Sequence, residues 1–145
     1  MSELGGSVLP LEHTLDGTLG IEILGRDEET IKGRFAVEDR VRQPYGIVHG
    51  GAILALAESI TSMATALGVM ADGNLAMGQE VSASFMRPIS DGHVNATARV
   101  RRRGRSAWVW EVEITNDEGR LCSLIRNTIA VRPAPGGLAK PPQQP

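Results

Sequence analysis

One long apolar segment with a single embedded carboxylate constrains this chain more than any other feature. The segment begins at Gly50-Gly51 after a polar loop, continues to about Met70, and contains Glu58. Its length and composition predict a helix that is halted near Asp72-Gly73-Asn74. Apolar residues occupy nearly every face of this helix, so we expect the rest of the chain to enclose it on most sides.

The other regular patterns are typical of strands separated by turns. Two runs precede the helix and form a predicted hairpin around Asp27-Glu28-Glu29, and four more follow the helix: residues 19–26, 30–37, 77–86, 93–103, 107–116 and 121–132. No other helix is expected. Six alanines in the helix allow close approach of a sheet. The simplest architecture is α+β, one long helix wrapped by a curved antiparallel β-sheet.

The length of the chain suits one compact domain. It has 145 residues, of which 41% are hydrophobic, enough for a single core. We expect this domain to span residues 11–133, after a flexible N-terminus at residues 1–10. The Pro/Gly-rich residues 134–145 read as a disordered tail.

Composition argues against several kinds of partner. A net charge of -2 and an aromatic content of 3% disfavour nucleic-acid binding. A single cysteine, Cys122, excludes a disulfide framework within the chain and reads as a small packed residue. Three widely spaced histidines give no metal-binding pattern, so we expect no metal site. The polar residues inside the apolar segment disfavour a membrane span, and without a secretory signal pattern the expected location is cytoplasmic.

Glu58 and the glycine pair together suggest a chemistry. An ionised carboxylate in apolar surroundings is costly unless something compensates for it. A glycine pair at a helix start offers free backbone N–H groups and the positive end of the helix dipole. A base or nucleophile combined with an anion-stabilising donor suits hydrolysis of an activated acyl group. The ordinary alternative is a satisfied carboxylate at the edge of the buried helix face.

The spacing of these two groups implies a second subunit. Gly50 and Glu58 are eight residues apart, which is ~12 Å along a helix axis. Both groups must lie within a few ångströms of one carbonyl carbon to act on it. Two antiparallel helices related by a two-fold axis would bring Gly50 of one subunit near Glu58 of the other. We therefore expect a homodimer.

Three further residues are candidates for supporting this chemistry. Ser62 stands one helical turn after Glu58 and could hold its carboxylate or a water, although a small core hydroxyl is equally typical there. Gln43, in the preceding loop, could donate to a developing oxyanion, although loop glutamines are usually solvated. His49 could act as a general acid that protonates the leaving group. A thioester would release a thiolate, which leaves without protonation, so a positioning role for His49 is favoured.

Arginines gather around one predicted hairpin turn. The cluster could be a solvated strand edge that discourages pairing with another sheet, or it could be a phosphate-binding site. Its members are Arg99, Arg101, Arg102, Arg103 and Arg105.

These residues resemble a known family. Gly46-Ile-Val-His-Gly-Gly-Ala52 and the following Leu-Ala-Glu58 are similar to the hot-dog-fold acyl-CoA thioesterases. The chain looks closest to the 4-hydroxybenzoyl-CoA thioesterases with an acidic residue on the long helix. Residues 12–18, 119–122 and 129–133 strengthen that match, which covers roughly residues 11–133.

The resemblance implies hydrolysis of an acyl-CoA without a metal or redox cofactor, in dimers that commonly pair into homotetramers. Glu58 would be the nucleophile or general base, and the Gly50 amide of the partner subunit would polarise the thioester carbonyl. Gln43 would assist at the carbonyl. Ser62 would stand where a helix threonine supports the water.

For the coenzyme, the resemblance makes Arg87 and Arg132 candidates for binding phosphates. The chain departs from its closest relatives at Arg105-Ser106-Ala107, where they place more small hydroxyl residues. Ser106 and Arg105 could still contact the nucleotide. Two other functions stay open: a hot-dog hydratase or dehydratase, disfavoured because His49 lacks a Phe-Pro-Gly context, and a module that binds acyl-CoA without hydrolysing it.

Overall fold

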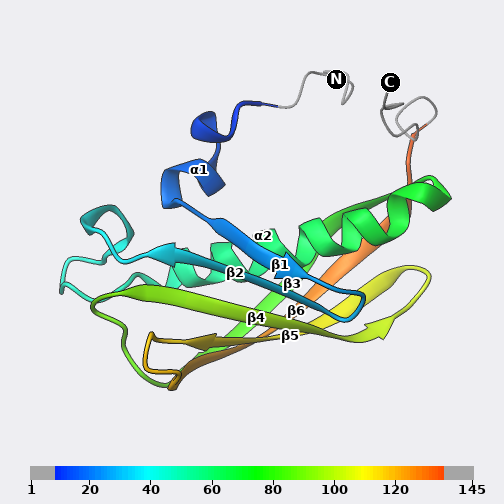
Figure 1. The fold of residues 1–145 in the computed structure, drawn as a ribbon. Coiled ribbons are helices and arrows are strands. Elements are labelled where there is room, and N and C mark those ends of the chain that lie inside the picture. The colour runs from blue at the N-terminus through cyan, green and yellow to red at the C-terminus, as the bar shows by residue number, and fades with distance from the viewer. Residues whose placement is uncertain (1–8, 136–145) are drawn as a thin grey trace.

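A 20-residue helix, α2 (Gly50–Val69), lies along one face of a curved six-stranded antiparallel sheet (Figure 1). This computed structural model describes residues 9–135. Along the sheet the strand order is β1-β2-β4-β5-β6-β3. The strands are β1 (Glu22–Arg26), β2 (Thr30–Ala36), β3 (Asn74–Phe85), β4 (His93–Arg103), β5 (Ala107–Thr115) and β6 (Leu121–Pro133).

The predicted α+β architecture is confirmed, with the long helix and all six strands in place. Helix α2 begins at Gly50 and gives way at Met70 to a short 3-10 turn, η3 (Met70–Asp72). Gly73 then reverses the chain with a positive φ of 74°. Most of the predicted flexible start and disordered tail lies outside the described residues.

The predicted turn of the first hairpin is held by its own aspartate. The carboxylate of Asp27 accepts hydrogen bonds from the N–H groups of Glu29 and Thr30 at 2.8 and 2.7 Å. These bonds, first that from Glu29, hold the pKa of Asp27 below its usual range because they favour the charged form. The turn therefore forms as the sequence predicts.

The expectation of a single helix is wrong. A short helix, α1 (Leu15–Leu19), is capped by the side chain of Thr14, which accepts from the Gly17 N–H. It packs beside α2, where the Ser59 hydroxyl donates to the Asp16 carboxylate at 2.7 Å. Five residues with a central glycine are too few to show helical periodicity. Two further 3-10 turns are η1 (Leu11–His13) and η2 (Asp39–Val41).

The core lies between α2 and the inner face of the sheet. Alternate residues of the strands point inward, so β4 and β5 each bury one face, as the imperfect apolar alternation of β5 indicates. The largest fully buried side chains come from β2, α2, β5 and β6: Trp110, Phe35, Ile31, Leu56, Ile60, Ile114, Ile125 and Ile129. This packing fixes α2 against the sheet.

The sheet wraps α2 as expected, but part of the helix surface remains exposed in the single chain. Met63 and Leu67 remain 39% and 49% exposed on the helix. Strand β3, at the end of the sheet, is exposed along most of its length, including Val81 and Phe85. By length and a mean hydropathy of 1.6, residues 50–72 could also cross a membrane. Packing of this helix onto the sheet accounts for that apolar character.

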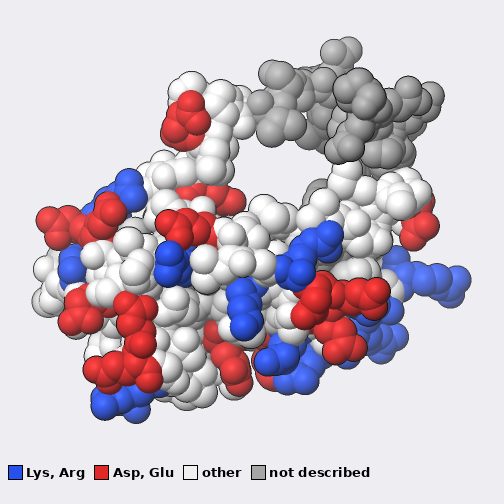
Figure 2. Space-filling view, in the orientation of Figure 1, with Lys and Arg blue, Asp and Glu red and all other residues white. Residues whose placement is uncertain are grey.

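Charged side chains of both signs are interspersed on the face of the molecule seen in Figure 2. Pairs across neighbouring strands explain part of this mixture. Arg34 lies 2.9 Å from Glu22, Arg126 lies 3.0 Å from Glu80, and Arg101 pairs with Glu111. The Glu111 carboxylate raises the pKa of Arg101 above its usual range. Exposed pairs of this kind add little stability individually.

Candidate active site

The start of helix α2 presents a free backbone donor. His49 is the N-cap, and its Nδ1 accepts a hydrogen bond from the Gly51 N–H at 2.8 Å. Nδ1 therefore carries a lone pair, and the proton of the neutral ring belongs on Nε2. The Gly50 N–H has no hydrogen-bond partner among the residues that the structure describes. It lies at the positive end of the helix dipole, where an anion is favoured.

Gln43 is fixed so that its amide nitrogen remains available. Its Oε1 accepts from the Tyr45 N–H at 3.2 Å, and its backbone is bonded to Ile47 and Gly46 at 2.9 Å each. With the oxygen engaged, Nε2 is left as a donor. Gln43, His49 and Gly50 line the same cavity, of about 500 Å³. Three of the predicted site residues are thus brought together.

The walls of this cavity, which we call the helix-start cavity, are mostly apolar. Phe85, at the end of β3, closes over Gly50 so tightly that a Cβ at Gly50 would lie 3.1 Å from the ring. Glycine therefore lets the Phe85 ring approach the start of the helix closely. The remaining apolar wall is made by Ile47, Val48, Ile53, Met86 and Ile89.

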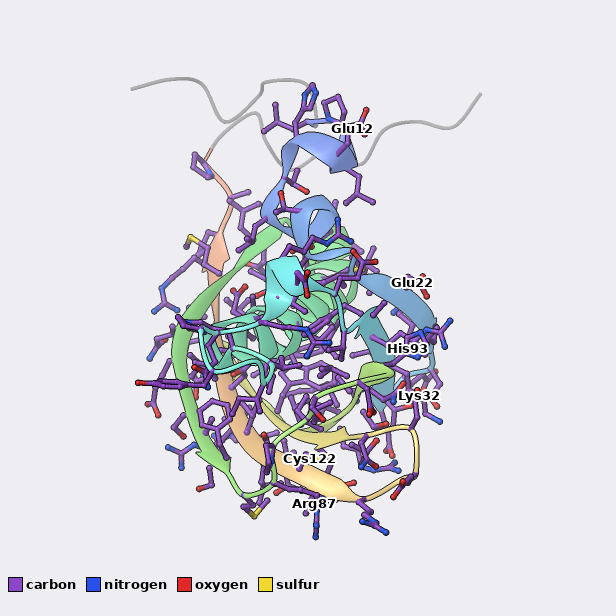
Figure 3. The ribbon with its side chains drawn as sticks, turned by 90° about the vertical axis from the view of Figure 1, so that its left-hand side faces the viewer. Glu12, Glu22, Lys32, Arg87, His93 and Cys122 are labelled. Carbon is purple, nitrogen blue, oxygen red and sulfur yellow. The ribbon has the colours of Figure 1, made fainter. Side chains whose placement is uncertain are left out.

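Two polar residues complete the helix-start cavity. Arg87 follows β3, and its N–H donates to the Cys122 carbonyl at 3.0 Å. Figure 3 shows Arg87 and Cys122 at the same end of the molecule. Ser123, the next residue along β6, also lines the cavity. The sequence analysis missed Ser123, because nothing in a strand pattern shows that a hydroxyl faces a cavity.

Glu58 lies elsewhere, on the side of α2 that faces β3. Its Oε1 accepts a hydrogen bond from the Ser62 hydroxyl at 2.8 Å, the pairing that the one-turn spacing predicts. Beside it is Gly78 of β3, where a Cβ would lie only 2.5 Å from Oε1. Gly78 therefore makes room for the carboxylate. The sequence analysis missed this residue, although a glycine inside a strand often marks such a close approach.

Buried hydrogen bonds fix the turn of α2 that carries Glu58. The Thr61 hydroxyl donates to the Ala57 carbonyl at 2.8 Å and accepts from the Asn127 side chain of β6 at 2.9 Å. One turn later, the indole N–H of Trp110 donates to Thr65 at 2.9 Å. These bonds fix the position of α2 along the sheet. The position of Glu58 on the helix is therefore determined by contacts between α2 and strands β5 and β6.

Glu58 and Ser62 do not line the helix-start cavity, which holds Gly50 and Gln43. The two halves of the predicted constellation are therefore separate in one chain, as the helical spacing requires. Each half is complete within one chain. Gly50 and Gln43 provide the donors at the start of α2, and two turns further along Ser62 is hydrogen-bonded to the Glu58 carboxylate.

The predicted coenzyme residues divide between the two ends of α2. Arg132 donates to the Ser106 carbonyl at 2.7 Å. Arg105 lines a second cavity, of about 430 Å³, beside Gly68 and Trp108 near the end of α2. Arg87, at the start of α2, lies at the opposite end, so Arg87 and Arg132 of one chain do not form a joint phosphate site.

Two of the clustered arginines are already engaged. Arg101 pairs with Glu111, and Arg103 lies 5.1 Å over the ring of Trp108. Cys122 is fully buried, as its interpretation as a packed residue requires, and donates to the Arg120 carbonyl. Across residues 9–135, no group of three His, Cys, Asp or Glu side chains is placed to hold a metal.

The chain is similar to a known protein family and to several solved structures. Residues 45–123 match the family model described as the thioesterase superfamily. A solved structure of a mutant thioesterase PA1618 from Pseudomonas aeruginosa is 35% identical and has a TM-score of 0.81. The alignment covers 84% of this chain and 88% of PA1618.

SAV0944 from Staphylococcus aureus is similar to this chain in two solved mutant forms, each 33% identical, with TM-scores of 0.79 and 0.80. They cover 82% and 83% of this chain and nearly all of SAV0944, 98% and 99%. The PaaI protein from the phenylacetic acid degradation operon of E. coli is 26% identical, with a TM-score of 0.73. That match covers 82% of this chain and 84% of PaaI.

The family match spans more than half of the chain and includes both Gly50 and Glu58. The fold of the solved thioesterases is the same helix wrapped by an antiparallel sheet. The chain therefore belongs to the thioesterase superfamily and is a thioester hydrolase.

Proposed function

We propose that the protein hydrolyses an aromatic, 4-hydroxybenzoyl-like acyl-CoA to the free acid and CoA, in a homodimer with two equal sites. One observation carries this proposal. The free Gly50 N–H and the Gln43 amide line one cavity, while the held carboxylate of Glu58 lies outside that cavity, beside Gly78 of the edge strand β3. A partner subunit supplies the missing half of each site.

The chemistry follows from these groups. The thioester oxygen accepts hydrogen bonds from the Gly50 N–H and Gln43, which stabilise the oxyanion as it forms. Glu58 of the partner subunit either attacks the carbonyl carbon, giving an anhydride that water cleaves, or removes a proton from the attacking water. The thiolate of CoA leaves in both routes. Ser62 keeps the Glu58 carboxylate oriented.

The open surfaces fit this dimer. A two-fold axis that brings Gly50 to Glu58 of the partner subunit would pass near Leu54, halfway between them. Because Phe85 contacts Gly50 and Gly78 contacts Glu58, the same axis would pass near Val81 on β3. There two β3 strands could pair edge to edge, which would cover the unpaired edge of the sheet. The resemblance further suggests that such dimers pair into a homotetramer.

Known mutants support the proposed pair of residues. The two solved forms of SAV0944 carry a glutamine-to-alanine and a glutamate-to-alanine substitution, fifteen positions apart. Gln43 and Glu58 have the same separation. PaaI, from an operon for an aromatic acid, and the apolar wall with Phe85 support an aromatic acyl group.

The coenzyme is proposed to extend along the subunit that supplies Glu58. Gly68, beside Arg105, is ten residues beyond Glu58, or ~15 Å along α2. The pantetheine arm could span this length and bring the phosphates to Arg105, Ser106 and Arg132. Arg87, contributed by the subunit that holds the carbonyl, is a separate candidate for a phosphate.

Replacing Glu58 with alanine tests the proposal. We expect thiol release from benzoyl-, 4-hydroxybenzoyl- and phenylacetyl-CoA to fall by about three orders of magnitude or more, because the nucleophile or base is lost. Sedimentation should show the variant folded and dimeric. Unchanged turnover in the Glu58→Ala variant, or a wild-type protein that releases no thiol from any CoA ester, would defeat it.

A further inference from the structure

Ser123 has a buried hydroxyl that no described residue satisfies. Its side chain is 1% exposed, and its Oγ has no hydrogen-bond partner among residues 9–135. A buried polar group without a partner is costly, and native proteins rarely keep one without a reason. Ser123 lines the helix-start cavity, so a bound group could supply the missing bond.

The sheet places Ser123 beside the proposed carbonyl site. Ser123 of β6 is paired with Phe85 of β3, so both side chains point to the same face of the sheet. The Phe85 ring in turn lies against Gly50. Gly50, Phe85 and Ser123 therefore follow one another in the lining of the cavity.

The chemistry of this path suits the acyl end of the substrate. Its walls include Ile53 and Ile89, which favour an uncharged group over a hydrated nucleotide. A thioester held at Gly50 would direct one of its two arms along these walls. Of the two arms, the acyl group is the apolar one. The pantetheine arm carries two amides and is joined to the phosphates of the nucleotide.

We propose that Ser123 recognises a polar substituent, a hydroxyl or keto oxygen, on the acyl group. This inference rests on the proposed function and deepens it. Ser123 would determine specificity without touching the reacting carbonyl. A substituent that bonds to the hydroxyl gives Ser123 Oγ the partner that it does not find among residues 9–135, whereas an unsubstituted ring offers none.

Asn127 provides a contrast. Its Oδ1 also lacks a partner among the described residues. However, its Nδ2 already bonds to Thr61, and Asn127 lines none of the cavities described above. Of these two unsatisfied side chains, Ser123 is the one that a substrate could reach.

Matched substrate pairs test the proposal. Thiol release is measured for benzoyl-CoA against its 2-, 3- and 4-hydroxy derivatives, and for butyryl-CoA against 3-hydroxybutyryl-CoA. The wild type should prefer at least one hydroxylated member by roughly tenfold or more in kcat/KM. Ser123→Ala should remove most of that preference and leave kcat/KM for the unsubstituted partner within about twofold.

Ser84→Ala is the matched control, because Ser84 is an exposed serine on β3 that does not line this cavity. It should keep the wild-type preference. The proposal is overturned if the wild type prefers no hydroxylated member, or if Ser123→Ala slows both members of a pair equally. If the wild type hydrolyses the esters, either of these results refutes only the role of Ser123 and leaves the thioesterase proposal standing. If the wild type hydrolyses none of the esters, both proposals are refuted.

Discussion

At the scale of single residues, Gly50 combines a free backbone donor with the absence of a side chain. Its N–H is free at the positive end of α2, and its lack of a side chain lets the Phe85 ring pack against the backbone. The neighbouring Gly51 N–H is used by His49, so the capping bond leaves one defined donor for the substrate. The helix start is therefore both stabilised and open to a ligand.

Replacing Gly50 with proline would remove this donor while keeping the helix. Proline is tolerated at the first helical position, and His49, at φ -67° and ψ 129°, already has the extended backbone that precedes proline. We expect kcat to fall by about 10²- to 10³-fold. Circular dichroism should show the helix content unchanged.

Gly50→Ala is the control, because it retains the N–H and adds only a Cβ at 3.1 Å from the ring of Phe85, a half-exposed side chain that needs to shift by only a few tenths of an ångström. It should keep most of the wild-type kcat. Equal activity of the proline and alanine variants would show that the amide does not stabilise the oxyanion.

The sequence predicts the residues of this site that lie near one another along the chain. The bond between Ser62 and Glu58 follows from helical spacing, and the Gly50 start follows from the polar loop before it. Gly78 and Ser123 could not be found in this way. They reach the site only because β3 pairs with β6 and packs against α2, and such long-range pairing is not encoded in local patterns.

At the scale of elements, length and apolar composition predicted the long helix, and strand-like runs between turn residues predicted every strand. Helix α1 was missed because it is short and depends on docking against α2. Helix α2 itself is held by polar contacts as well as apolar ones. Its side chains Thr61 and Thr65 are tied to β6 and β5.

Replacing Asn127 with alanine should loosen this attachment. The change removes the bond to Thr61 and leaves a small void, so we expect the free energy of unfolding to fall by about 1–3 kcal/mol. Urea denaturation measures the difference. Thr128→Ala, at the adjacent half-buried position on the opposite face, should cost less, and equal losses for the two variants would contradict the anchoring role.

At the scale of the whole molecule, the proposed sites need a second subunit. In one chain Met63 and Leu67 of α2 and Val81 of β3 are each left exposed. The sequence indicated the need for a partner, because Gly50 and Glu58 of one helix are too far apart to act on the same carbonyl. It could not show which strand edge would receive the partner.

The proposed coenzyme path can be tested with a truncated substrate. Arg105→Ala should raise KM for the CoA ester by roughly tenfold, because a charge-assisted contact to phosphate is lost. The N-acetylcysteamine ester of the same acid lacks the nucleotide and should be hydrolysed as by the wild type. Arg99→Ala is the control, since Arg99 is an exposed arginine of β4 away from that cavity. Parallel losses on both substrates would contradict a nucleotide contact.

Mixing two inactive variants tests most directly whether two subunits build each site. Glu58→Ala and Gly50→Pro, carried on differently tagged chains, are unfolded together, refolded and purified as mixed dimers. Each mixed dimer should contain one site with both defects and one intact site. We predict about half of the wild-type activity per mixed dimer. If the purified mixed dimer is as inactive as its parents, Glu58 and Gly50 do not act across the interface.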